Sequence, residues 1–466
     1  MTKTDSNNTA IFPVFKPRTS QVPIRHFALR PGFVWGASTS AYQIEGGIGA
    51  ESGRGRSIWE DYFDARPHLD NGEIACDHYN RMVEDVAMIK KMGLKAYRFS
   101  VAWPRIMPNG KGEINQEGLE FYSRLVDELL KNGIEPYLTL YHWDLPAALE
   151  KEGGWASRET CRHFAEYTQV VVNRLGDRVK HWCTFNEPEV IVAGYIGEGL
   201  APGLRNPSLR VQVGHNLMLA HGMAVKALRS YSKDLQVGIV LNLVPAEASN
   251  RSKAALDAAR RHWQRNYAWY LDGLFKGRYP RVVSLEARRH GVAISQEDME
   301  LINQTLDYLG INWYLRQVVN SRGKVLRVPA AQETLMGWEI NAAALTRMLI
   351  QMKADYKLPP IYITENGAAL KDEVVEQGGQ PAVHDLERMH YIYDHICALE
   401  KASLAGVDIR GYFAWSLMDN LEWSLGFSKT FGIVHVDRKT MQRTVKDSGL
   451  WYGLVIKVNT VGRGHG

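Results

Sequence analysis

The sequence predicts a single (β/α)8 barrel, the TIM-barrel architecture of the α/β class, over residues 31–466. An irregular arm, residues 1–30, precedes it. Eight short runs of apolar and aromatic residues alternate with amphipathic segments from residue 33 onward. Most of these runs are nearly continuous in apolar residues, as is typical of parallel strands that are covered on both faces. No linker, composition break or internal repeat divides the 466 residues, and α/β barrels of such length often form one domain.

The expected strands are Phe33–Ser38, Ala96–Trp103, Pro136–Trp143, His181–Asn186, Val237–Leu243, Tyr308–Tyr314, Ile361–Glu365 and Gly411–Leu417. The helical pattern between them is clearest in His78–Met92, which Gly93 follows, and in Leu119–Lys131, which ends ahead of Gly133. Scattered prolines and the lack of any period indicate that the N-terminal arm is irregular. A doubly wound open sheet is the alternative, but no Gly-x-Gly-x-x-Gly turn follows the first strand.

The composition indicates an ordinary globular protein, with 45% apolar and 23% charged residues. A net charge of +5 is too small to predict a nucleic-acid partner, and we interpret the basic runs at 260–262 and 288–290 as solvated helix faces. The four cysteines form no C-x-x-C pair, so we expect no zinc site and a reducing compartment. The polar N-terminus and the lack of a run of membrane-spanning length favour a cytoplasmic protein without a membrane partner.

Residues with chemical capacity gather where the expected strands end. Active sites of this barrel lie at the C-terminal ends of its strands. In chain order, those ends carry Gln43, Arg98, His142, Asn186 with Glu187, Asn242, Tyr314, Glu365 and Trp415. A carboxylate at the end of an apolar strand is costly to desolvate unless it is paired or used. Two carboxylates, here Glu187 and Glu365, are what cleavage of a glycosidic bond requires.

Six motifs carry a family resemblance, and they occur in the family's order. They are Phe33–Gly46, Tyr97–Ser100, Tyr141–Pro146, Thr184–Pro188, Ile363–Gly367 and Trp415–Trp423. Together they resemble the family 1 glycoside hydrolases, the β-glucosidase family, across about residues 33–452. The resemblance implies a retaining mechanism without metal or organic cofactor. Its small-molecule substrate would be a β-glycoside.

The resemblance implies that Glu365 is the nucleophile and Glu187 the general acid/base, with their carboxyl groups roughly 5–5.5 Å apart. We expect Arg98 to lie near Glu365 and to favour its ionised form, and Tyr314 to donate a hydrogen bond to it. The negative charge of Glu365 should hold the proton on Glu187 to higher pH. Once Glu365 is esterified, this repulsion disappears and Glu187 can act as a base.

Further positions match the family's sugar-binding residues, and aromatic residues at strand ends suit stacking on a sugar ring. These predicted binding residues are Gln43, His142, Trp143, Asn186, Trp415, Glu422 and Trp423 for the sugar, Trp338 for the aglycone, and Asn312 and Phe431 as pocket lining. On its own, His142 would be interpreted as a core histidine. Trp313 replaces the first tyrosine of the family's Asn-Tyr-Tyr motif, which leaves the aglycone preference open.

We therefore predict an exo-acting β-glucosidase of cellobiose-like or aryl β-glucosides, with a role in cellulose degradation. One alternative is a 6-phospho-β-glycosidase, but Glu422 stands where a phosphate would need cations. A catalytically silent sugar-binding protein would lack one catalytic carboxylate, and a thioglucosidase would carry Gln in place of Glu187. A metal-dependent hydrolase would need an early His-x-His. Gluco, galacto or fuco preference and assembly into a homo-oligomer stay open.

Overall fold

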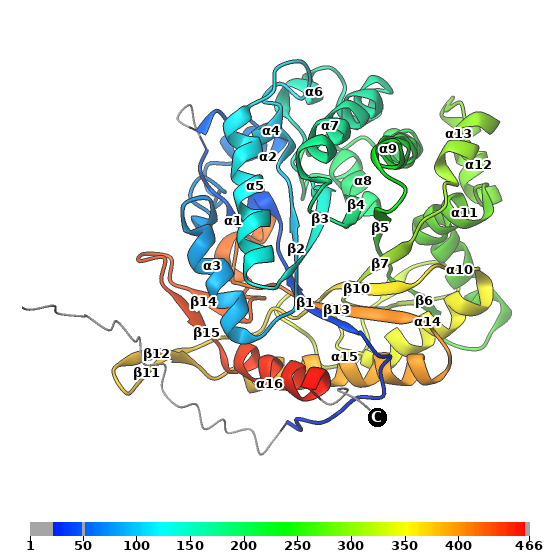
Figure 1. The fold of residues 1–466 in the computed structure, drawn as a ribbon. Helices are drawn as coiled ribbons and strands as arrows, with labels where there is room; N and C mark the ends of the chain where they lie inside the picture. Colours follow the sequence, from blue (N-terminus) through cyan, green and yellow to red (C-terminus); the bar gives the residue numbers. More distant parts are fainter. Residues whose placement is uncertain (1–21, 49–51, 462–466) are drawn as a thin grey trace, which may run out of the picture.

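Eight parallel strands close into a barrel in the computed structural model, which describes residues 22–48 and 52–461 (Figure 1). Around the barrel the order is β1-β13-β10-β7-β5-β4-β3-β2, so each strand lies beside the next barrel strand of the chain. Their bounds are β1 Val34–Ser38, β2 Ala96–Ser100, β3 Glu135–Tyr141, β4 His181–Asn186, β5 Gln236–Asn242, β7 Tyr308–Trp313, β10 Ile361–Asn366 and β13 Ile409–Trp415. The predicted (β/α)8 barrel is confirmed.

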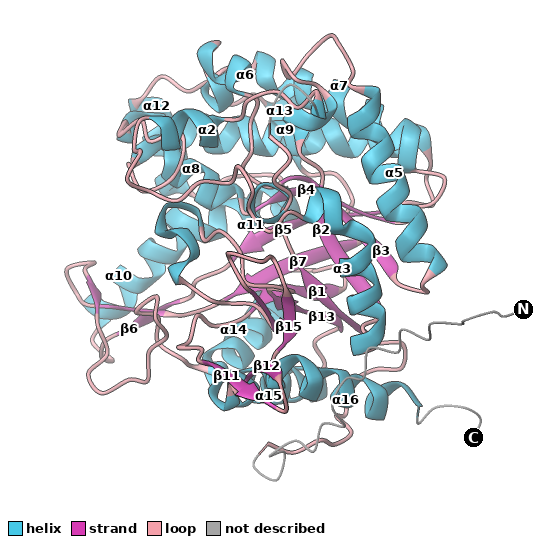
Figure 2. Cartoon of the chain, turned by 90° about the vertical axis from the view of Figure 1, so that its left-hand side faces the viewer, coloured by secondary structure: helices cyan, strands magenta, loops and turns pink. Residues whose placement is uncertain are grey.

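Helices surround the strands on the outside (Figures 1 and 2). They are α1 Ala41–Ile44, α2 Ile58–Asp64, α3 His78–Met92, α4 Trp103–Ile106, α5 Gln116–Lys131, α6 Ala147–Lys151, α7 Glu159–Leu175, α8 Pro188–Ile196, α9 Arg210–Tyr231, α10 Lys253–Trp263, α11 Trp269–Lys276, α12 Arg281–Arg289, α13 Gln296–Ile302, α14 Ala342–Asp355, α15 Leu386–Leu404 and α16 Asp447–Val461. The part of the chain that the structure describes also contains the short 3-10 helices η2 Gly154–Ala156, η3 Pro207–Leu209 and η5 Trp423–Ser428, and the π-helical turn η4 Gln264–Ala268.

Small two- and three-stranded sheets form in the segments between the barrel strands and helices. In one of them β8 Gln317–Val319 lies between β6 Ala246–Ala248 and β9 Val325–Leu326. The other two pair β11 Val374–Gln377 with β12 Gln380–Val383 and β14 Val434–Val436 with β15 Arg443–Val445. Only one expected strand end differs markedly from the structure. Trp103, predicted to end the second strand, begins α4, because Pro104 is well suited to the first turn of a helix and cannot donate in a sheet.

Large aromatic side chains fill the N-terminal half of the barrel interior. Tyr137, Tyr308, Tyr362 and Phe413 form one buried cluster with Ala96. Glycine makes room for them: a Cβ atom at Gly238 would lie 2.6 Å from the Tyr308 ring. The interior below the strand ends is therefore packed, and chemistry is confined to the C-terminal end of the barrel.

The strands β4 and β10, at whose ends the predicted catalytic carboxylates lie, are both irregular just before these residues. The β4–β5 register shifts between Cys183 and Asn186, and the β10–β7 register shifts between Ile363 and Glu365. Such bulges re-aim side chains and are over-represented beside active sites.

The described part of the predicted arm, residues 22–30, contains no helix or strand and packs on the outer helices. Arg25 pairs with Glu400 of α15 at 2.7 Å, and the Phe27 N–H donates to Asn459 of α16. Residues 1–21 of the predicted arm lie outside the described residues, so the division at residue 30 stays a prediction. Among the described residues, the structure has no helix that is long and apolar enough to cross a membrane.

Candidate active site

Glu187 and Glu365 are both buried at the C-terminal end of the barrel, where the sequence predicted them. Glu187 directly follows β4 and is the N-cap residue of α8. Its φ of 52° is unusual for a residue with a side chain, and its N–H donates to the Val240 carbonyl of β5 at 2.9 Å. Glu365 belongs to β10 itself. Pro188 suits the first helical position after the turn, since its missing donor would have no partner there.

A cation and a phenol hold the Glu365 carboxylate. Arg98 Nη1 lies 2.6 Å from Glu365 Oε1, and the Tyr314 hydroxyl donates to Oε2 at 2.9 Å. The second guanidinium nitrogen, Arg98 Nη2, donates to Asn186 Oδ1 at 2.7 Å. The Arg98 side chain is only 2% exposed, so little water screens its charge. Both contacts predicted for Glu365 are present.

Asn312 of β7 connects the two carboxylate surroundings. Its amide nitrogen donates to Glu187 Oε1 at 2.7 Å and to Asn186 Oδ1 at 3.0 Å. Its amide oxygen accepts from the Thr364 hydroxyl at 2.8 Å. One side chain is thereby fixed at three points, and it holds one oxygen of Glu187 in place.

The two carboxyl groups are electrostatically unequal. Burial raises the pKa of Glu187 well above its usual range, and the charge of Glu365 raises it further. Burial also raises the pKa of Glu365, but the charge and hydrogen bond of Arg98 and the hydrogen bond from Tyr314 oppose that rise. As the pair titrates, Glu365 therefore ionises first and Glu187 keeps the proton.

His142 follows β3, and its hydrogen bond fixes the tautomer. Asn186 Nδ2 and His142 Nε2 lie 3.1 Å apart, and because the amide can only donate there, the proton of a neutral ring sits on Nδ1. Burial, with the charge of Arg98, lowers the pKa of His142 well below its usual value, so the ring is neutral. Among the described residues, neither His142 Nδ1 nor Arg98 Nε has a hydrogen-bond partner. Buried donors without partners favour a ligand at this point.

Aromatic rings form one wall of the site around Trp423. Its ring lies 4.4 Å from that of Trp59 and 4.7 Å from that of Trp143, measured between centroids. Trp415 ends β13 and stacks at 5.8 Å from His142. Trp143 and Trp423 both have positive φ, as Glu187 does. Residues held in such conformations cluster at active sites and ligand clamps.

Comparison with known proteins places the chain in a family. The sequence model of Glycosyl hydrolase family 1 matches residues 26–461. The chain belongs to glycosyl hydrolase family 1. Beta-glucosidase A of Thermotoga maritima is 44% identical over 438 residues, which cover 92% of this chain and 97% of the relative. Beta-glucosidase A of Acetivibrio thermocellus is 41% identical, covering 92% and 98%.

A solved family 1 structure is similar throughout. The beta-glucosidase from Thermotoga maritima in complex with deoxynojirimycin superposes with a TM-score of 0.88 at 43% identity, covering 93% of this chain and 100% of that one. The resemblance inferred from the six motifs is thus confirmed at the level of the family.

Gln43 and Glu422 are two further predicted members of this family 1 site. Gln43 contacts the residues that directly precede Glu422 in the chain. The Gln43 amide nitrogen donates to Asn420 Oδ1 at 3.0 Å and to the Leu421 carbonyl at 2.7 Å, and its oxygen accepts from Ser40. Glu422 is partly exposed, and desolvation together with the charge of Glu365 raises its pKa to about 8.

Trp338 and Phe431 form the outer part of the family 1 site. The Trp338 ring lies 5.2 Å from that of Tyr314 and 6.2 Å from that of Phe431. Behind them, Arg316 pairs with Glu339 at 2.9 Å and holds the loop that carries Trp338. Direct contacts link the predicted site residues into one region, except for Gln43 and Glu422. Gln43 binds the segment that carries Glu422, which directly precedes Trp423.

Several residues that complete this family 1 site were not predicted from the sequence. Trp59 and Tyr42 pack on Trp423, and Asn420 binds Gln43. Tyr42 and Asn420 stand inside the motifs that carried the resemblance, which was a usable signal. Trp59 lies inside a Ser-x-x-Glu capping box, which predicts the start of a helix but not what that helix packs against.

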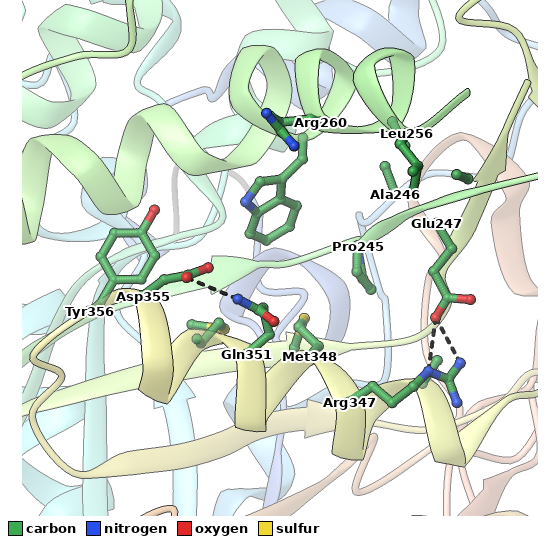
Figure 3. A pocket seen from close by; sticks show the side chains of 15 residues that line it. Pro245, Ala246, Glu247, Leu256, Arg260, Arg347, Met348, Gln351, Asp355 and Tyr356 are labelled. Atoms are coloured by element: carbon green, nitrogen blue, oxygen red, sulfur yellow. Dashed lines mark hydrogen bonds and ion pairs between the residues drawn. The ribbon is translucent and has the colours of Figure 1, made fainter. Parts of the chain in front are cut away.

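A separate pocket of about 590 Å³ lies outside this family 1 barrel, between α10 and α14 (Figure 3). Its polar rim is largely paired within itself, because Arg347 binds Glu247 and Gln351 binds Asp355. Among the described residues, no cluster of His, Cys, Asp and Glu could hold a metal ion.

Proposed function

We propose that this family 1 chain is a retaining, exo-acting β-glucosidase that releases terminal non-reducing β-D-glucosyl residues from cellobiose-like or aryl β-glucosides. The observation that carries the proposal is the buried pair of carboxyl groups, of which Glu365 is held by Arg98 and Tyr314 while Glu187 lies against an amide. The names of the relatives, both β-glucosidases, support it.

In the first step, a Glu365 oxygen forms a bond to the anomeric carbon as the glycosidic C–O bond breaks. Glu187 transfers its proton to the departing oxygen, so the aglycone leaves as a neutral alcohol. Asn312 donates to Oε1 of Glu187, which leaves Oε2 as the oxygen that carries the proton. The glycosyl ester on Glu365 no longer bears a negative charge.

In the second step, Glu187 accepts a proton from water, and the water oxygen bonds to the anomeric carbon as the ester bond breaks. Loss of the Glu365 charge in the ester removes one of the causes that raise the pKa of Glu187, so this residue can now act as a base. The sugar is released with the β configuration, and both carboxyl groups return to their starting states.

The remaining hydrogen-bonding groups suit a hydroxyl-rich glucosyl ring. The Asn186 amide nitrogen donates one proton to His142, so it keeps a second proton for a sugar hydroxyl. His142 Nδ1 offers another donor. Trp415 would lie beneath the ring and Trp338 would meet the aglycone, as predicted from the sequence.

The 6-phospho-β-glycosidase alternative is disfavoured by the environment of the eighth-strand loop. Glu422 places a carboxyl group where a phosphate would bind, and the nearby Lys429 ammonium donates to the Leu335 carbonyl at 2.9 Å. A silent binder is disfavoured because both carboxyl groups stand in a catalytic setting. A cytoplasmic location, in keeping with four free cysteines, stays a prediction, as do cellulose degradation, homo-oligomer formation and the lack of nucleic-acid partners.

Hydrolysis of p-nitrophenyl β-glucoside, followed by NMR of the first anomer released, tests the proposal. We expect the β-anomer from the wild type, loss of turnover in Glu365→Ala, and rescue of that variant by azide with formation of the α-glycosyl azide. Release of the α-anomer first, or near-normal turnover by Glu365→Ala, would contradict the assigned roles.

A further inference from the structure

Glu189 lies two residues beyond Glu187, in the first turn of α8, and the catalytic steps above do not use it. Its Oε1 accepts a hydrogen bond from the backbone N–H of Asn242, the last residue of β5. Its Oε2 is buried and has no hydrogen-bond partner among the described residues, and the same holds for the side-chain oxygen of Asn242. A carboxyl group in this setting is costly, so it calls for an explanation.

The bond to Asn242 completes a clamp around Glu187. The Glu187 N–H donates to the Val240 carbonyl at 2.9 Å, and the Glu189 carboxyl accepts from the N–H two residues farther along the same strand. Between these two attachments to β5 the backbone passes through the positive φ of Glu187. Such a conformation persists only where the surroundings impose it, and these two bonds tie the chain to β5 on both sides of it.

Charge couples the two carboxyl groups as well. Burial and Glu365 raise the pKa of Glu187 most, and the charge of Glu189 raises it further. Burial in turn raises the pKa of Glu189 to about 8. The other titratable or charged groups that face this pair are Arg98 of β2, Tyr267 of η4, Tyr270 of α11, Tyr314 after β7 and Glu365 of β10.

We propose that Glu189 is a positioning residue for the acid/base. Its carboxyl group accepts from β5 and so fixes the backbone turn that aims Glu187. This inference rests on the proposed function, because it presupposes that Glu187 protonates the leaving group.

Two substitutions test this positioning role. Glu189→Gln keeps an oxygen that can accept from Asn242 but cannot ionise, whereas Glu189→Ala removes both the acceptor and the charge. Glu150→Gln is the matched control. Glu150 of α6 is also a carboxyl group whose pKa burial raises, to about 7, but its partner is Tyr195 at the far end of α8.

The dependence of kcat/KM on the leaving group tests the positioning role. A misplaced acid harms substrates that need protonation, so Glu189→Ala should lower kcat/KM for phenyl β-glucoside about tenfold more than for 2,4-dinitrophenyl β-glucoside. A general loss of structure would slow both substrates alike, and that result, or equal rates in variant and wild type, would overturn the positioning role.

The conservative variant Glu189→Gln tests whether the hydrogen bond itself is what matters. Its amide oxygen can still accept from Asn242, so Glu189→Gln should keep the leaving-group dependence of wild type and of Glu150→Gln. A Gln variant that shows the same leaving-group dependence as Glu189→Ala would overturn the role of this hydrogen bond. If the wild type hydrolyses neither glucoside, the proposed function itself fails, which is seen before any variant is compared.

Discussion

Replacing Arg98 by Met should move the acid limb of the pH–rate profile. Arg98 is the cation that contacts Glu365, at 2.6 Å, and both side chains are at most 4% exposed. The variant would bury the Glu365 carboxyl without this partner. The ionised form of Glu365 is the one that attacks, so activity falls as pH drops through its pKa. Because losing a nearby positive charge raises that pKa, the acid limb must shift upward.

The size of this movement follows from the cost of an unpaired buried charge. Removing one partner of a buried ion pair costs about 3–5 kcal/mol. Because about 1.36 kcal/mol corresponds to one pH unit, this range amounts to roughly 2–4 pH units if Glu365 alone bears the cost. The hydrogen bond from Tyr314 persists in the variant, so we expect the lower end of the range. At a fixed pH below the new limb, kcat/KM then falls roughly tenfold for each pH unit by which the limb has moved.

The assay is kcat/KM for p-nitrophenyl β-glucoside from about pH 4 to about pH 9, a range chosen to bracket both limbs of the coupled pair. Arg105→Met is the matched control, because Arg105 pairs with Glu45 at 2.9 Å in an equally buried setting away from Glu365. It should lose stability without moving the acid limb. If Arg98→Met and Arg105→Met share the wild-type limb, Arg98 does not set the ionisation of Glu365 and the reasoning is refuted.

Three other variants probe different parts of the molecule. Asn312→Ala should lower kcat about tenfold for poor leaving groups and less for good ones, because it frees Glu187 Oε1; a leaving-group series checks this. Lys446→Met should lower the free energy of unfolding by about 3–5 kcal/mol in urea denaturation at neutral pH, since the buried ammonium lies 2.6 Å from Asp372. Burial raises the pKa of Asp372, but the neighbouring cations outweigh this and lower it. The difference in unfolding free energy between wild type and Lys446→Met should therefore shrink as pH falls below about 4. Trp338→Ala should raise KM for cellobiose while leaving hydrolysis of methyl β-glucoside nearly unchanged, because it removes an aglycone contact.

The strands could be predicted from sequence because each is a run of buried apolar residues bounded by polar ones. Local chemistry also sufficed for α3, where helical spacing and Gly93 give both the helix and its end. Trp103 was assigned to a strand because its aromatic side chain suits either a strand or a helix start, and Pro104 was the signal against a strand.

The sequence was sufficient to predict which residues form the site, but not which atoms of these residues contact one another. The motif order gave Glu187, Glu365 and Arg98, and the structure adds which atom of each binds which partner. Trp59 could not be predicted, because its role depends on where α2 packs, which no local pattern encodes. The unequal surroundings of the two carboxyl groups likewise depend on residues far away in the chain.

The irregular backbone at the strand ends explains why regular barrel geometry alone could not have placed the acid/base. Successive side chains of a regular strand point to opposite faces. Yet Asn186 and Glu187, adjacent in sequence, both accept hydrogen bonds from the amide nitrogen of Asn312. The shift of the β4–β5 register before Asn186 and the positive φ of Glu187 bring the two side chains to the same side. Since that turn is held by contacts to β5, a change at Val240 or Asn242 that loosened them would misdirect the proton without touching any group that binds the sugar.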